Sequence, residues 1–157
     1  MDGFGRELGC APDAHERAAL ADSIGTWPPF ADTVPSLRAL EGRYGMGVVS
    51  NVDDDIFAMT AATLGVPFDW VVTAQHVGAY KPSPRMFEAA IERIALPREA
   101  ILHVAQSAYH DVAPARALGL ATVLVRRRGC GATPPSGAAP DIDVPDLAAL
   151  VSVLGIE

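Results

Sequence analysis

The chain has 157 residues, a length typical of one domain with a single sizeable core. Half of its residues are apolar and the mean hydropathy is +0.21, which is typical of a globular protein. A formal net charge of −7 and a pI near 5.0 argue against a nucleic-acid partner, since phosphate backbones are bound by clustered Lys and Arg.

The first part of the chain predicts two helices joined by a stiff connector. Asp13 and, three positions later, Glu16 make a capping-box start for a helix that runs to about Ser23. The two prolines of segment 27–30 (Trp-Pro-Pro-Phe) bar helix there, and we interpret its two aromatics as packing anchors, with ligand contacts as the alternative. Apolar residues at helical spacing predict a second helix over 33–44.

From residue 46 onward, apolar strands alternate with helices. Strands are predicted at 46–49, 68–74, 100–105, 121–125 and, more briefly, 141–144. Helices are predicted over about 53–64, from 84 onward, over 111–118 and over 147–154, and the Gly/Pro/Ala-rich segment 129–140 predicts a surface loop. This alternation predicts one α/β domain, a parallel sheet with helices on both faces and with function at the carboxyl ends of the strands.

Polar residues follow the first of these strands directly. Ser50 and Asn51 stand where the strand ends and a helix begins, and unpaired amides and the positive end of the helix dipole meet there. This placement predicts an anion-binding site, with a helix N-cap as the alternative. We interpret the acids at 53–55 as surface charge that complements the helix dipole, although they would also repel a nearby anion.

A second polar loop, Gly-Ala-Tyr-Lys-Pro-Ser-Pro over 78–84, precedes a helix that Ser83 can cap and Pro84 can start. In a parallel sheet this loop lies on the same edge as Ser50. Lys81 is therefore predicted to be a functional residue at that edge, with a solvated loop lysine as the alternative.

The third strand also ends in polar residues. Gln106 and Ser107 are either binding residues or satisfied polar groups at a strand end, and Asp111 is either part of a site or the cap of its helix. We interpret His103, which lies inside the strand, as a hydrogen-bonded core histidine. His110 beside Asp111 suggests a proton relay, but no Ser or Cys nucleophile is evident beside it.

The two cysteines, Cys10 and Cys130, lie far apart without metal-binding spacing, so we expect a reduced, cytosolic protein. No apolar run approaches the roughly 18 residues of a membrane span, and residues 1–6 lack the pattern of a secretion signal. The basic run at 126–128 predicts a solvated strand exit, with an anion or partner contact as the alternative.

With the strand-end residues in order, the chain resembles the haloacid dehalogenase superfamily of hydrolases from about residue 27 to its end. Ser50 and Asn51 match that family's second motif, Lys81 in Tyr-Lys-Pro matches the third, and segment 103–111 matches the fourth. The resemblance implies a Rossmann-like parallel α/β fold and a small anionic substrate, either a 2-halo acid or a phosphate ester. It also implies catalytic roles for Lys81 and Asp111 and substrate binding by Ser50, Asn51, Gln106 and Ser107.

Two departures from the family pattern matter. The first motif, an Asp-x-Asp on the first strand, has no counterpart, so we expect residues 1–26 to be a remnant of the family's helical cap and 27–157 to be its α/β core. Gln106 is a neutral amide where phosphatase members place an acid, and this weakens any Mg²⁺ site, because Mg²⁺ prefers carboxylate oxygens. The substitution tilts the interpretation toward the metal-independent 2-haloacid dehalogenases, in which an aspartate displaces halide and the ester is hydrolysed.

Without that aspartate we expect little or no turnover from this chain, and the alternative is a non-catalytic binding or assembly module that retains the fold. In the resembled fold the first strand lies between the strands that end near Ser50 and Gln106. Buried backbone groups left unpaired there cost about 1–3 kcal/mol each. We therefore expect a strand from another chain, closing up of the two halves, or an altered path of residues 1–30, and hence self-association or rearrangement.

Overall fold

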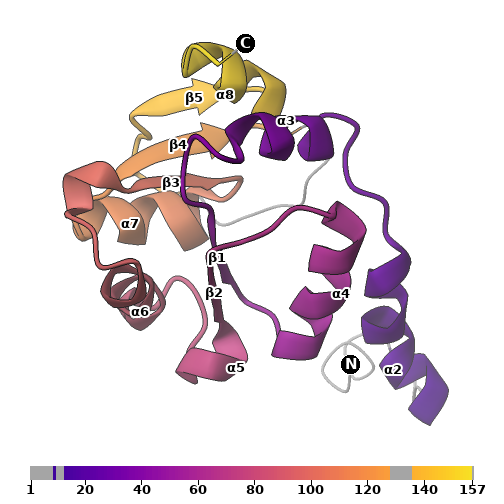
Figure 1. Ribbon diagram of the computed structural model, residues 1–157. Coiled ribbons are helices and arrows are strands. Elements are labelled where there is room, and N and C mark those ends of the chain that lie inside the picture. The colour runs from indigo at the N-terminus through magenta and orange to yellow at the C-terminus, as the bar shows by residue number, and fades with distance from the viewer. Residues whose placement is uncertain (1–8, 10–12, 128–135, 157) are drawn as a thin grey trace.

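The structure, a computed structural model, describes residues 9, 13–127 and 136–156 (Figure 1). Its strands are β1 (Gly47–Ser50), β2 (Trp70–Thr73), β3 (Leu102–Ala105), β4 (Ala121–Val125) and β5 (Ile142–Val144). β4 has the bounds that the sequence predicts, and the ends of the others differ from the predicted ones by at most two residues. All paired strands are parallel, which confirms the predicted fold class.

Helices connect these strands and cover both sides of them. In chain order they are α2 (Ala14–Ser23), η1 (Ile24–Thr26), α3 (Thr33–Leu40), α4 (Asp54–Leu64), α5 (Ala74–Val77), α6 (Pro84–Ile94), η2 (Arg98–Ala100), the π-helix η3 (Ala108–Val112), α7 (Ala113–Ala117) and α8 (Leu147–Val153). Figure 1 shows α6 and α7 on one side of the strands and α3, α4 and α8 on the other. The helix predicted over 111–118 is in fact two elements, η3 and α7.

Local sequence explains several of these boundaries. The predicted capping box at α2 is present: the Asp13 N–H donates to Glu16 Oε2 at 2.9 Å, and the Glu16 N–H donates to Asp13 Oδ1 at 2.8 Å. Gly65 ends α4 in the left-handed region with φ 61°, a conformation that glycine adopts without steric cost. Pro84 begins α6, where its missing N–H has no helical partner to lose.

The strands form two separate sheets rather than one. β1 pairs with β2, with Ser50 opposite Thr73, while β3, β4 and β5 pair in that order, with Ala105 opposite Leu124. A cavity of about 660 Å³ lies between the two sheets, and residues of both β1 and β3 line it. The two halves of the fold have therefore not closed up through a β1–β3 ladder.

Residues 13–30 do not fill that cavity either. None of the residues 13, 16, 18, 19 and 22–30, whose side chains the structure describes, lines it. Instead η1 contacts α4, beside which α2 also lies in Figure 1. Of the three arrangements that the sequence left open, the closing up of the halves is absent. An altered path into the cavity is absent as well for residues 13–30, while residues 1–8 and 10–12 lie outside the described part of the chain.

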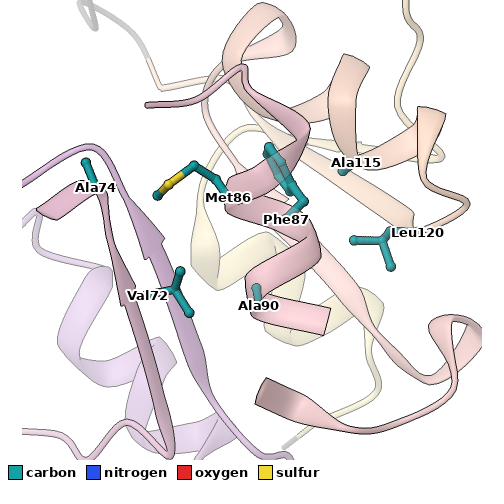
Figure 2. Close-up of a cluster of buried hydrophobic side chains, with 7 residues drawn as sticks. All are labelled: Val72, Ala74, Met86, Phe87, Ala90, Ala115 and Leu120. Atoms are coloured by element: carbon teal, nitrogen blue, oxygen red, sulfur yellow. The ribbon is translucent and has the colours of Figure 1, made fainter. Parts of the chain in front are cut away.

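Helix α6 supplies the centre of the core. Met86 and Phe87 are almost fully buried, and they pack between Val72 of β2 and the region of α7 and Leu120 (Figure 2). Burying a side chain of this size contributes about 1.5–3 kcal/mol. A second apolar cluster, consisting of Val123, Val125, Val144 and Leu150, joins β4, β5 and α8.

The segment around the basic run makes internal contacts. Arg127 donates two hydrogen bonds of 2.8 Å to the Asp32 carboxylate, which also accepts the Leu147 N–H at 2.8 Å. The Arg127 guanidinium lies 4.3 Å from the centre of the Phe30 ring. Phe30 and Trp27 are each more than half exposed, so interpreting them as packing anchors was wrong. Asp32 and Arg127 thus join the start of α3 to the end of β4 and to α8.

Within the described ranges, none of the helices combines the length and the apolar character that crossing a bilayer requires.

Candidate functional site

The loop before α6 places Lys81 at the carboxyl end of β1. The Lys81 Nζ donates to the Val49 carbonyl at 2.9 Å and to Asp111 Oδ1 at 2.7 Å. Its side chain is only 14% exposed. Lys81 therefore bridges the end of β1 and η3, which follows β3, and it belongs to both halves of the fold. The predicted approach of Lys81 to the end of the first strand is present.

Asn51 fixes the main chain of Lys81. Its side-chain Nδ2 donates to the Lys81 carbonyl at 3.0 Å, and its Oδ1 accepts the Lys81 N–H at 2.6 Å. The Lys81–Pro82 peptide bond is cis. The Asn51 amide is thus used to position the lysine loop, and sequence reasoning, which assigned it to substrate binding, did not foresee this contact.

Asp111 is the acid of the site. Its side chain is 7% exposed, and its Oδ1 lies 2.7 Å from Lys81 Nζ and 3.0 Å from His103 Nε2. Burial raises the pKa of Asp111, but the His103 hydrogen bond and the Lys81 charge outweigh burial and hold the pKa below its ordinary value. The carboxyl is therefore ionised near neutral pH, with both partners donating to it. Asp111 lies inside η3 and is not the cap of a helix, which removes that alternative.

His103 is the hydrogen-bonded strand histidine that the sequence predicted, and it is partly buried. Its ring packs edge to face against the Phe87 ring, with 5.1 Å between the ring centroids, and its side chain is 14% exposed. Sequence reasoning anticipated a hydrogen-bonded core residue but missed its partner. The available signal was an ionisable group in an apolar strand, which needs a polar partner because burial without one is costly.

Ser50 ends β1, and its backbone leads toward the start of α4. The N-cap of α4 is Asp53, so neither Ser50 nor Asn51 is the helix cap that the sequence left open as the alternative. The Ser50 side chain is half-buried, and no hydrogen bond to its hydroxyl is found within the described residues. The hydroxyl thus has its donor and acceptor capacity available for a ligand.

Gln106 and Ser107 differ in how they are used. Gln106 is exposed at the end of β3, whereas Ser107 is the N-cap of η3, and its Oγ accepts the His110 N–H at 3.0 Å. Ser107 Oγ also lies 3.1 Å from His110 Nδ1. A serine does stand beside His110, contrary to the sequence expectation, but it is 7% exposed and serves as a cap.

The acids at the start of α4 are exposed, as predicted. One of them has a further contact: the Thr73 hydroxyl at the end of β2 donates to Asp54 Oδ1. The Asp54 N–H in turn donates to Gln75 Oε1 at 2.9 Å. Asp54 therefore ties α4 to the end of β2.

The described donor set offers Mg²⁺ little. Hard Mg²⁺ prefers carboxylate oxygens, and here the Asp111 carboxylate is already bonded to Lys81 and His103. Gln106 offers only a neutral amide. No group of three or more His, Cys, Asp or Glu residues suited to a metal ion occurs in the part of the chain that the structure describes.

A family model described as haloacid dehalogenase-like hydrolase matches residues 5–119, well over half of the chain. The chain belongs to this family. The haloacid dehalogenase-like chain is 32% identical over 151 residues to the (S)-2-haloacid dehalogenase of Pseudomonas sp. strain YL, an alignment that covers 94% of this chain and 64% of the relative. It is 31% identical over 129 residues to mouse haloacid dehalogenase-like hydrolase domain-containing protein 3, covering 75% of this chain and 51% of the relative.

Solved structures agree with this assignment. The haloacid dehalogenase-like chain superposes on an L-2-haloacid dehalogenase with a TM-score of 0.82 at 26% identity, covering 98% of this chain and 68% of that one. A haloacid dehalogenase-type phosphatase from Thermococcus onnurineus gives a TM-score of 0.74 at 25% identity, covering 99% and 71%. The chain thus spans between half and about two thirds of the length of the curated relatives named here.

Proposed function

We propose that this chain is a haloacid dehalogenase-like domain of the 2-haloacid dehalogenase lineage that binds a small carboxylate anion and turns it over slowly or not at all by itself. The position of Lys81 carries the proposal. Its ammonium is held at the carboxyl end of β1, beside a serine whose hydroxyl is available, and the (S)-2-haloacid dehalogenase of Pseudomonas is among the relatives.

Each residue has a distinct task in this proposal. The Ser50 hydroxyl and the amides that follow β1 bind the carboxylate of a 2-halo acid, because helix starts favour anions. Lys81 neutralises negative charge at the reacting centre. Asn51 and Asp111 act as positioning residues, since one holds the main chain of Lys81 and the other its ammonium. Gln106, exposed at the same edge, is available to the polar side of the ligand.

The expected low turnover follows from the burial and the hydrogen bonds of the Asp111 carboxylate. Displacing halide from a 2-halo acid by covalent catalysis needs a carboxylate in line with the carbon that bears the halogen. The carboxylate of this site, Asp111, is almost fully buried and is bonded to two cations or donors, so it is poorly placed to attack. Both 2-halo acids and phosphate esters are anions, so the proposed anion site is compatible with either class of substrate.

The alternative is a non-catalytic binding or assembly module that retains the fold. The position of Asp111 between Lys81 and His103 favours such a module, because these contacts stabilise the fold whether or not a reaction takes place. We also propose that residues 1–26 are a remnant of a helical cap, supported by the contact of η1 with α4 outside the cavity.

Two assays test the proposal. Binding of 2-chloropropionate is followed by amide chemical shifts, and release of chloride and of phosphate from a generic ester is measured with and without Mg²⁺. We expect saturable chloropropionate binding with shifts at the end of β1, and chloride release that is slow or absent. Residual release that Lys81→Ala abolishes would support an enzyme, whereas binding without release would support the module.

Ser50→Ala is the sharper variant, because the hydroxyl it removes has no hydrogen bond to lose in the described structure. It should weaken chloropropionate binding while leaving the fold intact. Arg85→Ala removes an exposed cation from the same region and serves as the control. Binding that is equally strong in wild type, Ser50→Ala and Lys81→Ala would refute the proposed anion site.

A further inference from the structure

The Asp111 carboxylate receives two donors on one of its oxygens. Asp111 Oδ1 lies 2.7 Å from Lys81 Nζ and 3.0 Å from His103 Nε2. Burial raises the pKa of Asp111, and among the contacts that lower this pKa the His103 hydrogen bond comes first, ahead of the Lys81 charge. His103 is therefore a principal reason that this carboxyl is ionised.

The contact with Asp111 determines which nitrogen of the His103 ring carries a proton. An ionised carboxylate only accepts hydrogen bonds, so His103 Nε2 is the donor. Nδ1 of the same ring makes no hydrogen bond within the described part of the chain. The ring therefore has two states that keep this contact, a neutral ring with its proton on Nε2 and an imidazolium with a second proton on Nδ1.

His103 is held by strand pairing and by packing. It lies opposite Thr122 in the β3–β4 ladder, and Thr122 is fully buried. The His103 ring packs against Phe87, which is 1% exposed. Asp111, by contrast, lies in a π-helix of five residues, and Lys81 lies in a loop. The strand histidine is thus the fixed point from which the carboxylate is positioned.

The position of the carboxylate sets the direction of the Lys81 ammonium. An ammonium has three N–H donors. Two of them are used by the Val49 carbonyl and by Asp111 Oδ1. Because these two bonds fix the ammonium, they also fix the direction of the third donor. Without the His103 bond the carboxylate could turn, and this direction would be lost.

The charge of the three side chains, called here the His103 cluster (Lys81, His103 and Asp111), depends on the histidine. The ammonium and the carboxylate cancel each other. The cluster is therefore neutral when the ring is neutral and carries one positive charge when the ring is an imidazolium.

Few other charged groups face the His103 ring from the elements around it. The paired strand, 121–125, contains no charged residue, and in η3 the His110 ring is hydrogen-bonded to Ser107 Oγ. The charged side chains of α6 are all exposed: Arg85, Glu88, Glu92 and Arg93. Among the described residues, Asp111 and Lys81 are thus the charges that the ring meets.

We propose that His103 is a positioning residue that holds the Lys81 ammonium at the end of β1 through Asp111, and that raises the charge of the His103 cluster from zero to one when Nδ1 takes up a proton from solvent. The consequence for ligands rests on the proposed anion site. An anion beside Lys81 favours the charged ring, so anion binding takes up a proton and is tighter at low pH.

The ligand-free protein tests the charge of the cluster. The carbon-13 NMR signal of the His103 ring, assigned by its loss in His103→Gln, gives the protonated fraction of the ring. At the pH where half of the wild-type ring is protonated, Asp111→Asn should lower this fraction to about a tenth, because it removes the negative neighbour. Lys81→Met removes the positive neighbour and should raise the fraction. His76→Gln, at an exposed histidine, should leave it unchanged.

Calorimetry with 2-chloropropionate tests the proton uptake. Binding is measured at about pH 5 and about pH 8, in pairs of buffers with different ionisation enthalpies, which count the protons taken up. Wild type should bind about tenfold more tightly at the lower pH. His103→Gln keeps an N–H donor near the place of Nε2 but takes up no proton, and should bind equally at both pH values. His76→Gln and His110→Gln should keep the wild-type pH dependence.

Two substitutions of His103 separate positioning from packing. His103→Phe keeps a ring against Phe87 and removes the donor to Asp111, so it should weaken binding at about pH 8 by about tenfold. His103→Gln should retain wild-type affinity at that pH. A residue that only filled space would give the opposite order, because phenylalanine replaces the packing better. If His103→Phe does not fold, His103→Asn takes its place, since its shorter amide does not reach Asp111.

The outcomes distinguish this inference from the proposed function. Equal protonated fractions of the ring in wild type, Asp111→Asn and Lys81→Met would overturn the role of His103. Wild-type binding that is independent of pH, or His103→Phe binding as tightly as His103→Gln, would also overturn it and would leave the anion site standing. If wild type binds no 2-chloropropionate at either pH, the proposed anion site fails, and the ligand-free fractions decide the role of His103.

Discussion

Replacing Lys81 by methionine removes the charge that neutralises Asp111 while keeping most of the side-chain length. In the structure the two side chains are 14% and 7% exposed and lie 2.7 Å apart. Removing one partner of a buried pair leaves an uncompensated charge in a medium of low polarity. Such a loss typically costs about 3–5 kcal/mol, which is a large part of the total stability of a domain of this size.

The cost should depend on pH in a defined direction. In the wild type the pKa of Asp111 lies below its ordinary value of 3.8, so its contribution to stability is present above 3.8 and is lost as pH falls through the lower folded-state value. In Lys81→Met burial is less opposed, and the pKa of Asp111 rises. The difference in the free energy of unfolding between wild type and variant should therefore narrow as the pH falls from about 7 to about 4. In that range Asp111 of the variant becomes protonated, which removes the charge left without its partner.

Urea unfolding followed by circular dichroism at both pH values measures the difference in the free energy of unfolding. The double variant Lys81→Met/Asp111→Asn is the control and should recover most of the loss, since it removes the unpaired charge together with its partner. A loss below about 1 kcal/mol that is the same at both pH values would refute the reasoning, because it is the behaviour of an exposed ion pair.

Two further predictions concern stability. Asp32→Asn breaks the ion pair with Arg127, in which the Arg127 side chain is 13% exposed and the Asp32 side chain 18%. It should lower the melting temperature by roughly 3–10 °C, at about 2–4 °C per kcal/mol of lost stability. Asp143→Asn, in the exposed pair with Arg126, should shift it by less than about 3 °C, and equal shifts would contradict the distinction. Ala95→Gly should raise the free energy of unfolding by up to about 1 kcal/mol, because Ala95 ends α6 with φ 55°, and a measured decrease would contradict this backbone assignment.

Features fixed by neighbouring residues could be predicted from the sequence. β4 has its predicted bounds because an apolar run between Gly119 and a basic segment defines both of its ends. The capping box of Asp13 and Glu16 depends on a spacing of three residues, and the helix end at Gly65 depends on one glycine. The order of polar strand ends was enough to predict that Lys81 meets the end of β1, because parallel strands bring their carboxyl ends to one edge.

What the sequence did not provide is the pairing of side chains across the fold. Arg127 and Asp32 are 95 positions apart, and nothing local to the basic run distinguishes an internal ion pair from a solvated strand exit. The Ser107–His110 contact is an N-cap contact between residues three positions apart, and it was missed because the sequence placed the start of this helix at Asp111 instead of Ala108. The role of Asn51 was missed for a similar reason, since its partner is the main chain of a residue thirty positions away.

The contact between Asn51 and the main chain of Lys81 has a consequence for protein engineering. Because two hydrogen bonds to the backbone hold residue 81 in place, the path of the loop does not depend on which side chain that residue carries. Position 81 can accordingly be varied at a fixed point of the backbone, provided that Asp111→Asn is introduced with it, because loss of the lysine alone leaves the Asp111 carboxylate without its cation. Libraries with His, Arg or Cys there, screened with Asn51 retained, would sample new reactivity on the same loop.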